Sequence, residues 1–357
     1  MGIAGLNFYH DEPLFGLDIG NSSLKVMQLS PAKTKIPEVL GYGVSSHYPN
    51  GCTANGVIVN KKSLGEALYD LLSNRLVGTI TTKRVACSIP SSHTFSRPMK
   101  LPIMEKEELS EAVRLEVEQY IPVPIDSLYL DYEVSRKTDK EIELLTVAIP
   151  RKIVDSYVDF LETMGLEPVS LEPTMNALCR IFSTADPSHD SPSILIDFGS
   201  VATDLAVFDQ SMFVNSTVPA GSDLLIDMIS KNLGIPPAEA RTAKINQGIS
   251  GEHSRILEIV KSTLDDLVKE IQKVIRYHSE RSAPAHRAIS QVILMGGGST
   301  MPGLSAYLSK ALSMPARSLD PWSHLNFGSL NQPGEQDRSI YLTVAGEAIL
   351  NPKEIFV

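Results

Sequence analysis

The sequence predicts an α/β protein with two lobes and a duplicated core. Its 357 residues exceed the roughly 100–200 residues that are typical of one domain. A motif of a strand, an Asp-x-Gly turn and a second strand begins at Phe15 and recurs at Ile194, about half a chain later. The polar, proline-containing segment 186–192 precedes the second copy and is typical of a linker between lobes. We therefore expect a duplicated domain in which each half opens with the same β-hairpin.

Composition and charge exclude several classes of protein. Hydrophobic residues make up 43% of the chain and charged residues 21%, which is ordinary for a globular protein. The formal net charge is −10, and an acidic chain gains nothing from the counterion release that drives nucleic-acid binding. Cys52, Cys87 and Cys179 form no CxxC motif, and their odd number argues against a disulfide framework. We expect reduced thiols in a cytosolic protein that does not bind nucleic acid.

No segment of the sequence indicates direct insertion into a membrane. No apolar run reaches the ~20 residues that are needed to cross a bilayer. The stretch from Met1 to Pro13 lacks the basic and apolar regions of a secretory signal, and residues 351–357 are too few for an amphipathic membrane helix. The sequence predicts flexible tails at 1–13 and 351–357 and a soluble cytoplasmic protein that reaches a membrane only through a partner.

Apolar periodicity predicts the remaining elements. Alternating apolar residues indicate paired strands at 128–134 and 141–149, and a short apolar run indicates a buried strand at 292–295. Segment 318–338 shows neither period, so a long irregular loop is expected there. Helical spacing predicts helices at 62–72, 105–120, 154–164, 263–278 and 304–312.

The chemistry of the repeated turns suits a phosphate chain and a metal ion. Asp18 and Asp197 each end a strand before a glycine-containing turn. Backbone N–H groups and hydroxyls of such turns can take phosphate oxygens, while the carboxylate holds a hydrated Mg²⁺. A single Asp-x-Gly turn is more often only a tight hairpin, but two that face each other would hold a triphosphate from both sides.

A third glycine-rich turn follows the strand at 292–295. Gly296 to Ser299 lies between that strand and a predicted helix, where glycines allow a base and a ribose to approach the backbone closely. Such turns are common in α/β proteins. The order of all three motifs is therefore more specific than any one of them.

Together the three motifs resemble the superfamily of actin, sugar kinases and Hsp70 chaperones. The resemblance implies a duplicated RNase H-like actin/Hsp70 fold that binds ATP and Mg²⁺ in a cleft between two lobes. It assigns the first phosphate element to Asp18–Lys25, the second to Asp197–Thr203 and the adenosine element to Gly296–Ser299. Segments Glu172–Leu178 and Tyr341–Ala348 resemble the two helices that connect the lobes.

Within this superfamily the chain is similar to the PilM family, the actin-like cytoplasmic proteins of type IV pilus assembly. Gln-Tyr-Ile-Pro-Val-Pro at 119–124 and Asp-Tyr-Glu at 131–133 are similar to its signature. The resemblance extends from 14 to 350. It implies that residues 91–166 form the inserted β-α-β-β-α subdomain of SHS2 type that this family shares with FtsA. The core of lobe I would then be 14–90 and 167–190, and lobe II would be 191–350.

The resemblance also implies roles for individual residues. Asp18 and Asp197 would face Mg²⁺ and its waters, and Glu172 is the one candidate for a catalytic base, although a structural Glu is an equal alternative. At most a slow ATPase is expected. The residues expected to bind nucleotide are Asp18, Gly20, Asn21, Ser22, Ser23, Lys25, Asp197, Gly199, Thr203, Lys244, Gly297, Gly298 and Ser299.

One position departs from the family pattern. Relatives place an acidic residue three positions before the Lys that approaches the ribose, and here Arg241 precedes Lys244. An Arg cannot accept hydrogen bonds from ribose hydroxyls, so a scaffold that has lost its nucleotide is the alternative. Glu270 and Lys273 are weaker adenosine candidates, and their spacing equally fits a surface ion pair.

The implied partner is a PilN-like single-span inner-membrane protein. Its N-terminal cytoplasmic tail would dock between the first subdomain and the inserted one, near helix 105–120 and the strand that follows. The chain would thus lie in the cytoplasm, peripheral to the inner membrane. The resemblance also allows contacts with other pilus platform or motor proteins and homo-oligomers.

Two other function classes remain open from the sequence. An FtsA-like filament-forming cell-division protein would share most of these motifs. A small-molecule kinase would need a carboxylate that deprotonates a substrate hydroxyl, and no motif here indicates one. ATP-dependent polymers with lipid binding would favour the first alternative, and rapid ATP consumption with a sugar would favour the second.

Overall fold

The computed structural model describes residues 13–30, 36–45, 51–251, 254–281 and 287–350. The expected tails 1–13 and 351–357 lie outside these ranges, apart from Pro13. None of the described helices combines the length and apolar character that a membrane span requires. All three cysteines are buried and free, which confirms the expected thiols.

The first sheet has six strands in the order β11-β7-β1-β2-β3-β6. Strands β1 and β2 form the expected hairpin, and β1 and β11 run parallel to β7 on the other side. Helices α1 and α3 pack on one face of this sheet, while α4 and α9 cover the other. The bounds are β1 Phe15–Ile19, β2 Leu24–Leu29, β3 Val39–Ser45, β6 Leu76–Gly78, β7 Arg84–Ile89, β11 Glu167–Pro173 and α1 Lys61–Asn74, with a small hairpin of β4 Thr53–Ala54 and β5 Val57–Ile58.

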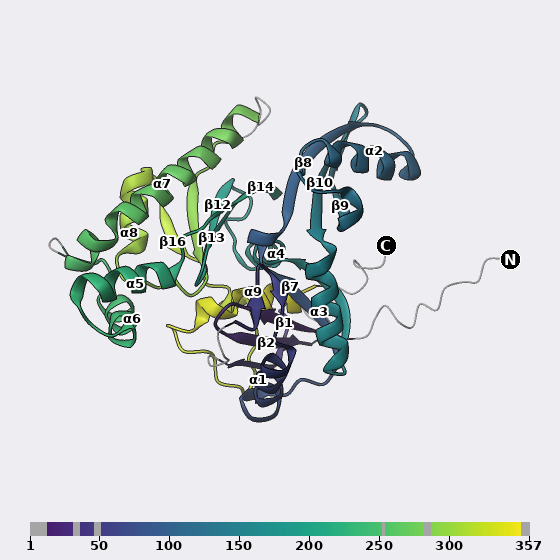
Figure 1. Ribbon diagram of the computed structural model, residues 1–357. Helices are drawn as coiled ribbons and strands as arrows, with labels where there is room; N and C mark the ends of the chain where they lie inside the picture. Colours follow the sequence, from purple (N-terminus) through teal and green to yellow (C-terminus); the bar gives the residue numbers. More distant parts are fainter. Residues whose placement is uncertain (1–12, 31–35, 46–50, 252–253, 282–286, 351–357) are drawn as a thin grey trace.

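The inserted segment follows the predicted order β-α-β-β-α. Strands β8, β10 and β9 form a separate three-stranded antiparallel sheet, and helix α2 packs on it through Leu109, Val113 and Val117. In Figure 1 the three-stranded sheet and α2 project beyond the first sheet, while α3 packs on that sheet. The bounds are β8 Phe95–Pro102, α2 Lys106–Glu118, β9 Leu128–Lys137, β10 Glu141–Pro150 and α3 Arg151–Thr163.

The second sheet repeats the first, with strand order β14-β13-β12-β15-β16. This order matches β3-β2-β1-β7-β11, with the same antiparallel and parallel pairings. The duplication predicted from the two hairpins is therefore confirmed by topology. The bounds are β12 Ser193–Phe198, β13 Thr203–Asp209, β14 Ser211–Val218, β15 Gln291–Met295 and β16 Ala316–Ser318.

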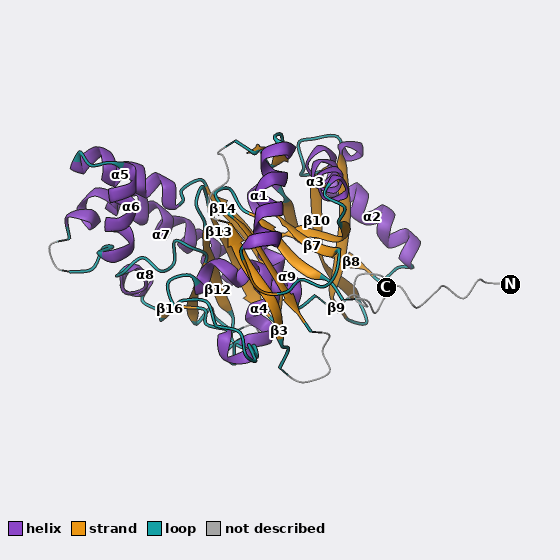
Figure 2. Ribbon diagram, turned by 90° about the horizontal axis from the view of Figure 1, so that it is seen from below, coloured by secondary structure: helices purple, strands orange, loops and turns teal. Residues whose placement is uncertain are grey.

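Helices α5 to α8 cover the outer face of the second sheet and gather on the side away from the first sheet (Figure 2). Helix α7 is longer than its predicted core of 263–278, because its apolar stripe continues from Leu264 back to Ile256 against the sheet. The bounds are α5 Ser222–Leu233, α6 Pro237–Asn246, α7 Arg255–Arg281 and α8 Leu304–Leu312.

Helices α4 Thr174–Ala185 and α9 Leu342–Ala348 connect the two halves and cross closely. A Cβ on Gly346 would lie 2.0 Å from the carbonyl oxygen of Ala177, so only glycine permits this crossing. The first connecting helix was expected to begin at Glu172. It begins at Thr174 instead, because Glu172 continues strand β11 and Pro173 ends that strand.

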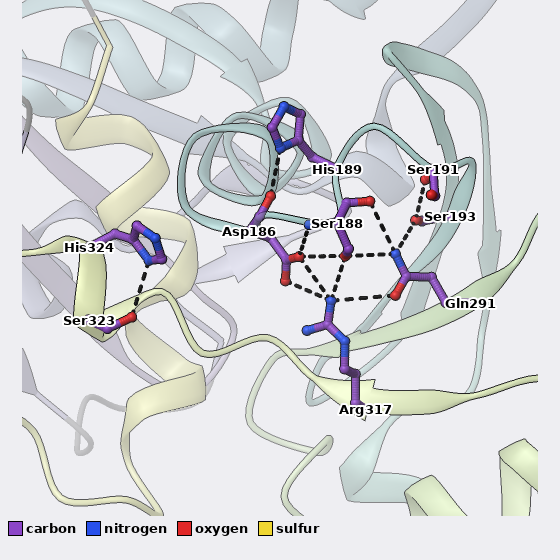
Figure 3. Close-up of polar contacts among 9 residues, drawn as sticks. All are labelled: Asp186, Ser188, His189, Ser191, Ser193, Gln291, Arg317, Ser323 and His324. Carbon is purple, nitrogen blue, oxygen red and sulfur yellow. Dashed lines mark hydrogen bonds and ion pairs between the residues drawn. The ribbon is translucent and has the colours of Figure 1, made fainter.

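A cluster of polar side chains holds the segment after α4 against strands β15 and β16 of the second sheet (Figure 3). The Arg317 guanidinium donates to Asp186 Oδ1 at 2.9 Å and to Ser188 Oγ at 2.8 Å, and Gln291 Nε2 donates to Ser188 Oγ at 2.8 Å. Asp186 follows α4, and Arg317 lies on β16, which precedes the long segment 319–341 leading to α9. The predicted linker is therefore held against the second sheet. The exact bounds of the lobes remain a prediction.

Candidate functional site

The first hairpin places a buried ion pair at its turn. Asp18 and Lys25 face each other across β1 and β2, and Lys25 Nζ lies 2.8 Å from Asp18 Oδ2. Gly20 N donates to Ser23 O at 3.0 Å and closes the turn. A Cβ on Gly20 would lie 2.8 Å from Lys25 Nζ, so the glycine leaves room for the ammonium group beside Asp18. The exposed residues Asn21 and Ser22 form the tip of the turn.

Ser88 completes this half of the site, although no sequence motif indicated it. Its hydroxyl donates to Asp18 Oδ1 at 3.1 Å. The contact arises from the parallel pairing of β1 with β7, which sets Asp18 opposite Ser88. Asp18 therefore has a partner on each carboxylate oxygen before any ligand binds.

The second hairpin has the same backbone and a different set of charges. Gly199 N donates to Asp197 O and to Ala202 O, both at 3.1 Å. Asp197 faces Asp204 across β12 and β13, so two carboxyl groups stand side by side. The Thr203 hydroxyl donates to Ala220 O at 2.6 Å. Because that hydroxyl proton is already engaged, the predicted contact of Thr203 with phosphate remains a prediction.

Charges of the first hairpin act on the second. The pKa of Asp197 is raised to about 7, first by burial, then by the charges of Asp204 and Asp18, while Lys25 opposes the shift. Burial raises the pKa of Asp204 to about 6, and its hydrogen bond from Thr217 acts in the opposite direction. Lys25 thus acts on Asp18 and Asp197 while Asp204 adds a further carboxyl group, and this surplus of negative charge would attract a cation.

The carboxyl groups fit Mg²⁺ that keeps its water shell. Within the described ranges, no group of three or more His, Cys, Asp or Glu side chains could hold a metal ion by itself. Mg²⁺ usually keeps several waters and binds one or two carboxylates together with substrate phosphates. Asp18 and Asp197, one from each hairpin, could supply those one or two carboxylates, so the residues present fit a hydrated ion.

The glycine-rich turn after β15 packs directly on the second hairpin. A Cβ on Gly296 would lie 2.1 Å from Asp197 Oδ1, and one on Gly298 would lie 2.1 Å from Phe198 Cδ1. Gly296 also has a φ of +77°. Ser299 is buried and donates to Gly296 O at 2.7 Å, while Gly297 is exposed. The predicted adenosine element therefore adjoins the second phosphate element.

Lys244 is a buried cation on α6 with an exposed fraction of 4%. Its pKa is lowered to about 8, first by burial and then by the charge of Arg241, while the charge of Asp223 opposes both effects. Arg241 Nη2 lies 3.4 Å from Asp223 Oδ1, and Asp223 N donates to Ser200 O at 2.8 Å. Arg241, the residue that departs from the family pattern, is thus exposed and pairs with Asp223 beside the turn of the second hairpin. Glu270 and Lys273 form an exposed ion pair at 2.6 Å, the alternative noted for their spacing.

Glu172 is held by an arginine. Both of its carboxylate oxygens accept hydrogen bonds from Arg180, each at 2.7 Å. Glu172 lies opposite Ser88 on β7, which itself lies opposite Asp18 on β1. The predicted base is therefore near the first hairpin, but neither oxygen is free to take a proton from water in this arrangement. Its catalytic role stays a prediction.

Glu172 also lines a cavity of about 810 Å³. The cavity lies among β9 and β10 of the insert, β11 and α4 of the first half, and the turn between β13 and β14. Of the region that the sequence indicated for a partner, strand β9 contributes to the lining, whereas α2 does not. The charged lining residues are Asp131, Glu133, Glu172 and Arg180, and the apolar ones include Leu145, Val147, Phe208 and Met212.

Comparison with known families gives a match over nearly the whole chain. The family described as "Type IV pilus assembly protein PilM" matches residues 16–351. Two curated proteins match over shorter stretches. A cell division protein FtsA from Neisseria meningitidis is 23% identical over 208 residues, 52% of this chain and 49% of that protein. A type II secretion system protein L from Xanthomonas campestris is 29% identical over 68 residues, 19% of this chain and 18% of that protein. The chain thus spans less than half the length of either curated relative.

Solved structures share the fold at low identity. A PilM-PilN type IV pilus biogenesis complex has a TM-score of 0.82 at 21% identity, covering 95% of this chain and 98% of that one. The ethanolamine utilization protein EutJ from Carboxydothermus hydrogenoformans has a TM-score of 0.56 at 15% identity, with 95% and 90% covered. MreB5 of Spiroplasma citri bound to ADP has a TM-score of 0.53 at 13% identity, with 97% and 98% covered. The actin-like fold predicted from the sequence is confirmed.

Proposed function

This chain belongs to the PilM family of type IV pilus assembly proteins, and we propose that it is an actin-like, ATP-binding scaffold of the pilus assembly platform. The observation that carries the nucleotide part is the meeting of two hairpins, where Asp18, Asp197 and Asp204 outnumber the single Lys25. Family membership favours this function over an FtsA-like filament former and over a small-molecule kinase.

The nucleotide would bind with its phosphates between the hairpins. Backbone N–H groups at Gly20 to Ser23 and at Gly199 would take phosphate oxygens, and Lys25 would turn from Asp18 toward the phosphates. Asp18, Asp197 and Asp204 would hold Mg²⁺ through its waters, and the ion would offset the charge of the phosphates. The nucleoside would lie along Gly297 to Ser299, within reach of Lys244.

Turnover would be slow, because the one candidate for a catalytic base is not free. Glu172 is occupied by Arg180, and the remaining carboxyl groups at the cleft are those proposed to face the metal. Binding of ATP, rather than its consumption, would then set the angle between the halves and change affinity for a partner.

The partner would be a PilN-like single-span inner-membrane protein whose cytoplasmic tail enters the 810 Å³ cavity. The cavity lining has three acidic residues and one basic residue, so it favours a tail segment with positive charge. Its apolar residues favour an apolar stretch next to that charge. Through this tail the chain would lie at the cytoplasmic side of the inner membrane. Further platform or motor proteins and a second copy of the chain remain open as additional partners.

Calorimetric titration with Mg-ATP tests the nucleotide site. Wild-type protein should bind one equivalent, and Asp18→Ala should weaken binding at least ~10-fold, since an interaction with a charged group contributes about 1.5–3 kcal/mol. Asp227→Ala is the matched control, because this exposed Asp pairs with Lys231 on α5, outside the two hairpins. Absence of binding at millimolar Mg-ATP would overturn the nucleotide part and leave a scaffold without nucleotide.

Fluorescence anisotropy with a labelled synthetic peptide of the PilN-like tail tests the cavity. Glu133→Lys should weaken peptide binding, because it reverses a charge in the lining. Glu118→Lys places the same change on the exposed face of α2 and should have no effect. An equal loss in both variants would show that the peptide senses only overall charge, and a loss confined to Glu118→Lys would move the site to α2.

A further inference from the structure

A single guanidinium group joins the wall of the cavity to the second connecting helix. Arg180 lies on α4 and lines the cavity, where it makes a two-pronged ion pair with Glu172 of β11. The same Nη1 atom also donates to the carbonyl oxygen of Gly346 on α9, at 2.9 Å. Arg180 of α4 therefore contacts two further elements, β11 and α9.

The next residue on α9 is a second carboxyl group that depends on the same cation. Glu347 has no exposed surface. Its pKa is raised well above the usual value, first by burial and then by the charge of Glu172, and Arg180 opposes the shift. One guanidinium thus acts on two acidic side chains, and in this structure it donates hydrogen bonds to Glu172 and to the Gly346 carbonyl oxygen.

Helix α9 packs closely against both α4 and β1. A Cβ on Gly16 would lie 2.5 Å from Val344 O and 2.8 Å from Glu347 Cβ, so the backbone of β1 touches the helix two residues before Asp18. On the other side, Gly346 meets Ala177 of α4. Since close-packed interiors transmit displacements, a shift of α9 would move the first hairpin.

We propose that Arg180 is a positioning residue that couples the cavity to the nucleotide cleft by choosing between Glu172 and Glu347. This inference rests on the proposed function of both sites. A cationic partner segment in the cavity competes for Glu172 and releases Arg180 toward Glu347. The changed contact of α9 with β1 alters the setting of Asp18 and hence the affinity for Mg-ATP. By linkage, Mg-ATP changes the affinity for the partner by the same factor.

The test is a pair of titrations on the whole chain. The Kd of Mg-ATP is measured by calorimetry with and without a saturating synthetic peptide of the PilN-like tail, in the wild type and three variants. We expect the peptide to change the Kd at least ~5-fold in the wild type, at the lower end of usual coupling factors. Glu347 does not line the cavity. Glu347→Gln should therefore keep the Kd of each ligand alone within about threefold of the wild type, and the peptide should change its Kd of Mg-ATP less than about twofold.

Two further variants separate coupling from damage to the fold. Arg180→Lys keeps the charge but cannot hold Glu172 with two prongs and reach Gly346 as well, so it should also lose coupling. Arg317→Lys alters a comparable ion pair, with Asp186, outside the cavity lining and should retain wild-type coupling. Circular dichroism melting checks that each variant is folded.

The outcomes distinguish this inference from the proposed function. Both ligands binding the wild type independently would overturn the coupling and leave the scaffold function standing. Wild-type coupling retained in Glu347→Gln and Arg180→Lys would show that another route joins the sites and would overturn the role of Arg180. Failure of the wild type to bind Mg-ATP or the peptide would overturn the proposed function and the inference with it.

Discussion

The two hairpins of this protein have the same backbone and opposite electrostatics. In the first, Asp18 is matched by Lys25 and Ser88, so its charge is compensated within the protein. In the second, Asp197 faces another carboxyl group, Asp204, and in the part of the chain that the structure describes no ion pair reaches either. Under the proposed function, the first half of the site would be prepared in advance, whereas the second half would hold uncompensated negative charge until a cation binds.

The largest expected effect follows from this difference and has opposite signs in the two hairpins. Asp18→Asn and Asp197→Asn should each weaken Mg-ATP binding by about 10–100-fold. Without nucleotide, however, Asp197→Asn should raise the free energy of unfolding at pH 8 by about 1–3 kcal/mol, because it removes an uncompensated buried charge. Asp18→Asn should lower it by about 2–3 kcal/mol, because Lys25 loses its partner.

Urea unfolding of the nucleotide-free variants, combined with calorimetry, measures both quantities. If Asp18→Asn stabilised the fold and Asp197→Asn destabilised it, the comparison of the hairpins would be wrong. The carboxylate whose charge is compensated would then lie in the second hairpin.

The second prediction concerns pH. The pKa of Asp197 is raised to about 7 in the folded chain, so the folded state holds this proton more tightly than the unfolded state does. Stability from this group is fully present below the usual Asp pKa near 4 and is lost as pH rises through about 7. Asp204, raised to about 6, adds a loss of the same sign.

Unfolding midpoints in urea between pH 5 and pH 8 check this dependence. The nucleotide-free wild type should lose stability across that range, and Asp197→Asn should flatten the profile. Because Mg²⁺ would compensate the carboxylates, saturating Mg-ATP should also flatten it. A pH profile that is unchanged by Asp197→Asn would show that Asp197 does not cause the loss of stability at high pH.

The third prediction concerns Lys244, a cation in the second half of the chain. Lys244 is buried, and its pKa is lowered to about 8, first by burial. A charged Lys is therefore unfavourable there until an anion arrives. Lys244→Met should stabilise the nucleotide-free protein by about 1–2 kcal/mol below pH 8 and weaken Mg-ATP binding by about 10-fold.

Lys231→Met is the control for Lys244→Met, since its ammonium is exposed and pairs with Asp227. Thermal melting and calorimetry measure the two effects. If Lys244→Met weakened the fold and left ATP binding unchanged, Lys244 would be a structural residue, and the nucleoside would lie elsewhere.

Much of this fold could be predicted from the sequence, because its main signal is local and repeated. The two Asp-x-Gly hairpins, the glycine turn at 296–299 and the order of elements in the insert all appear as short patterns. The site was harder to predict because its partners come from pairing between strands. Ser88 reaches Asp18 only through the parallel pairing of β7 with β1.

Two other omissions have different causes. Asp204 stood next to Thr203 in the repeated motif, and the register of the hairpin sets it opposite Asp197; its signal was present in the sequence. Glu172 was assigned to the connecting helix because the pattern does not mark where β11 ends, and its engagement by Arg180 depends on tertiary packing. Local patterns thus predict the backbone of the cleft better than its charges.

The smallest expected effect compares the glycines of the two turns. A Cβ on Gly199 would lie 2.9 Å from the carbonyl oxygen of Ala202, which is fixed backbone. A Cβ on Gly20 would meet Lys25 Nζ at 2.8 Å, and this flexible end can withdraw, although Ser23 O lies 3.1 Å away. Gly199→Ala should therefore lower the free energy of unfolding by about 1–2 kcal/mol, and Gly20→Ala by less than about 1 kcal/mol.

Gly20→Ala should have its main effect on the ligand rather than on the fold. A displaced Lys25 leaves Asp18 less compensated, so the first hairpin would come to resemble the second. Its affinity for Mg-ATP should then decrease by about 2–5-fold, because the displaced ammonium group no longer lies beside the phosphates. Calorimetric titration of Gly20→Ala with Mg-ATP measures this change. An affinity equal to that of the wild type would show that Lys25 keeps its place beside Asp18 despite the methyl group, and that the glycine serves only the turn.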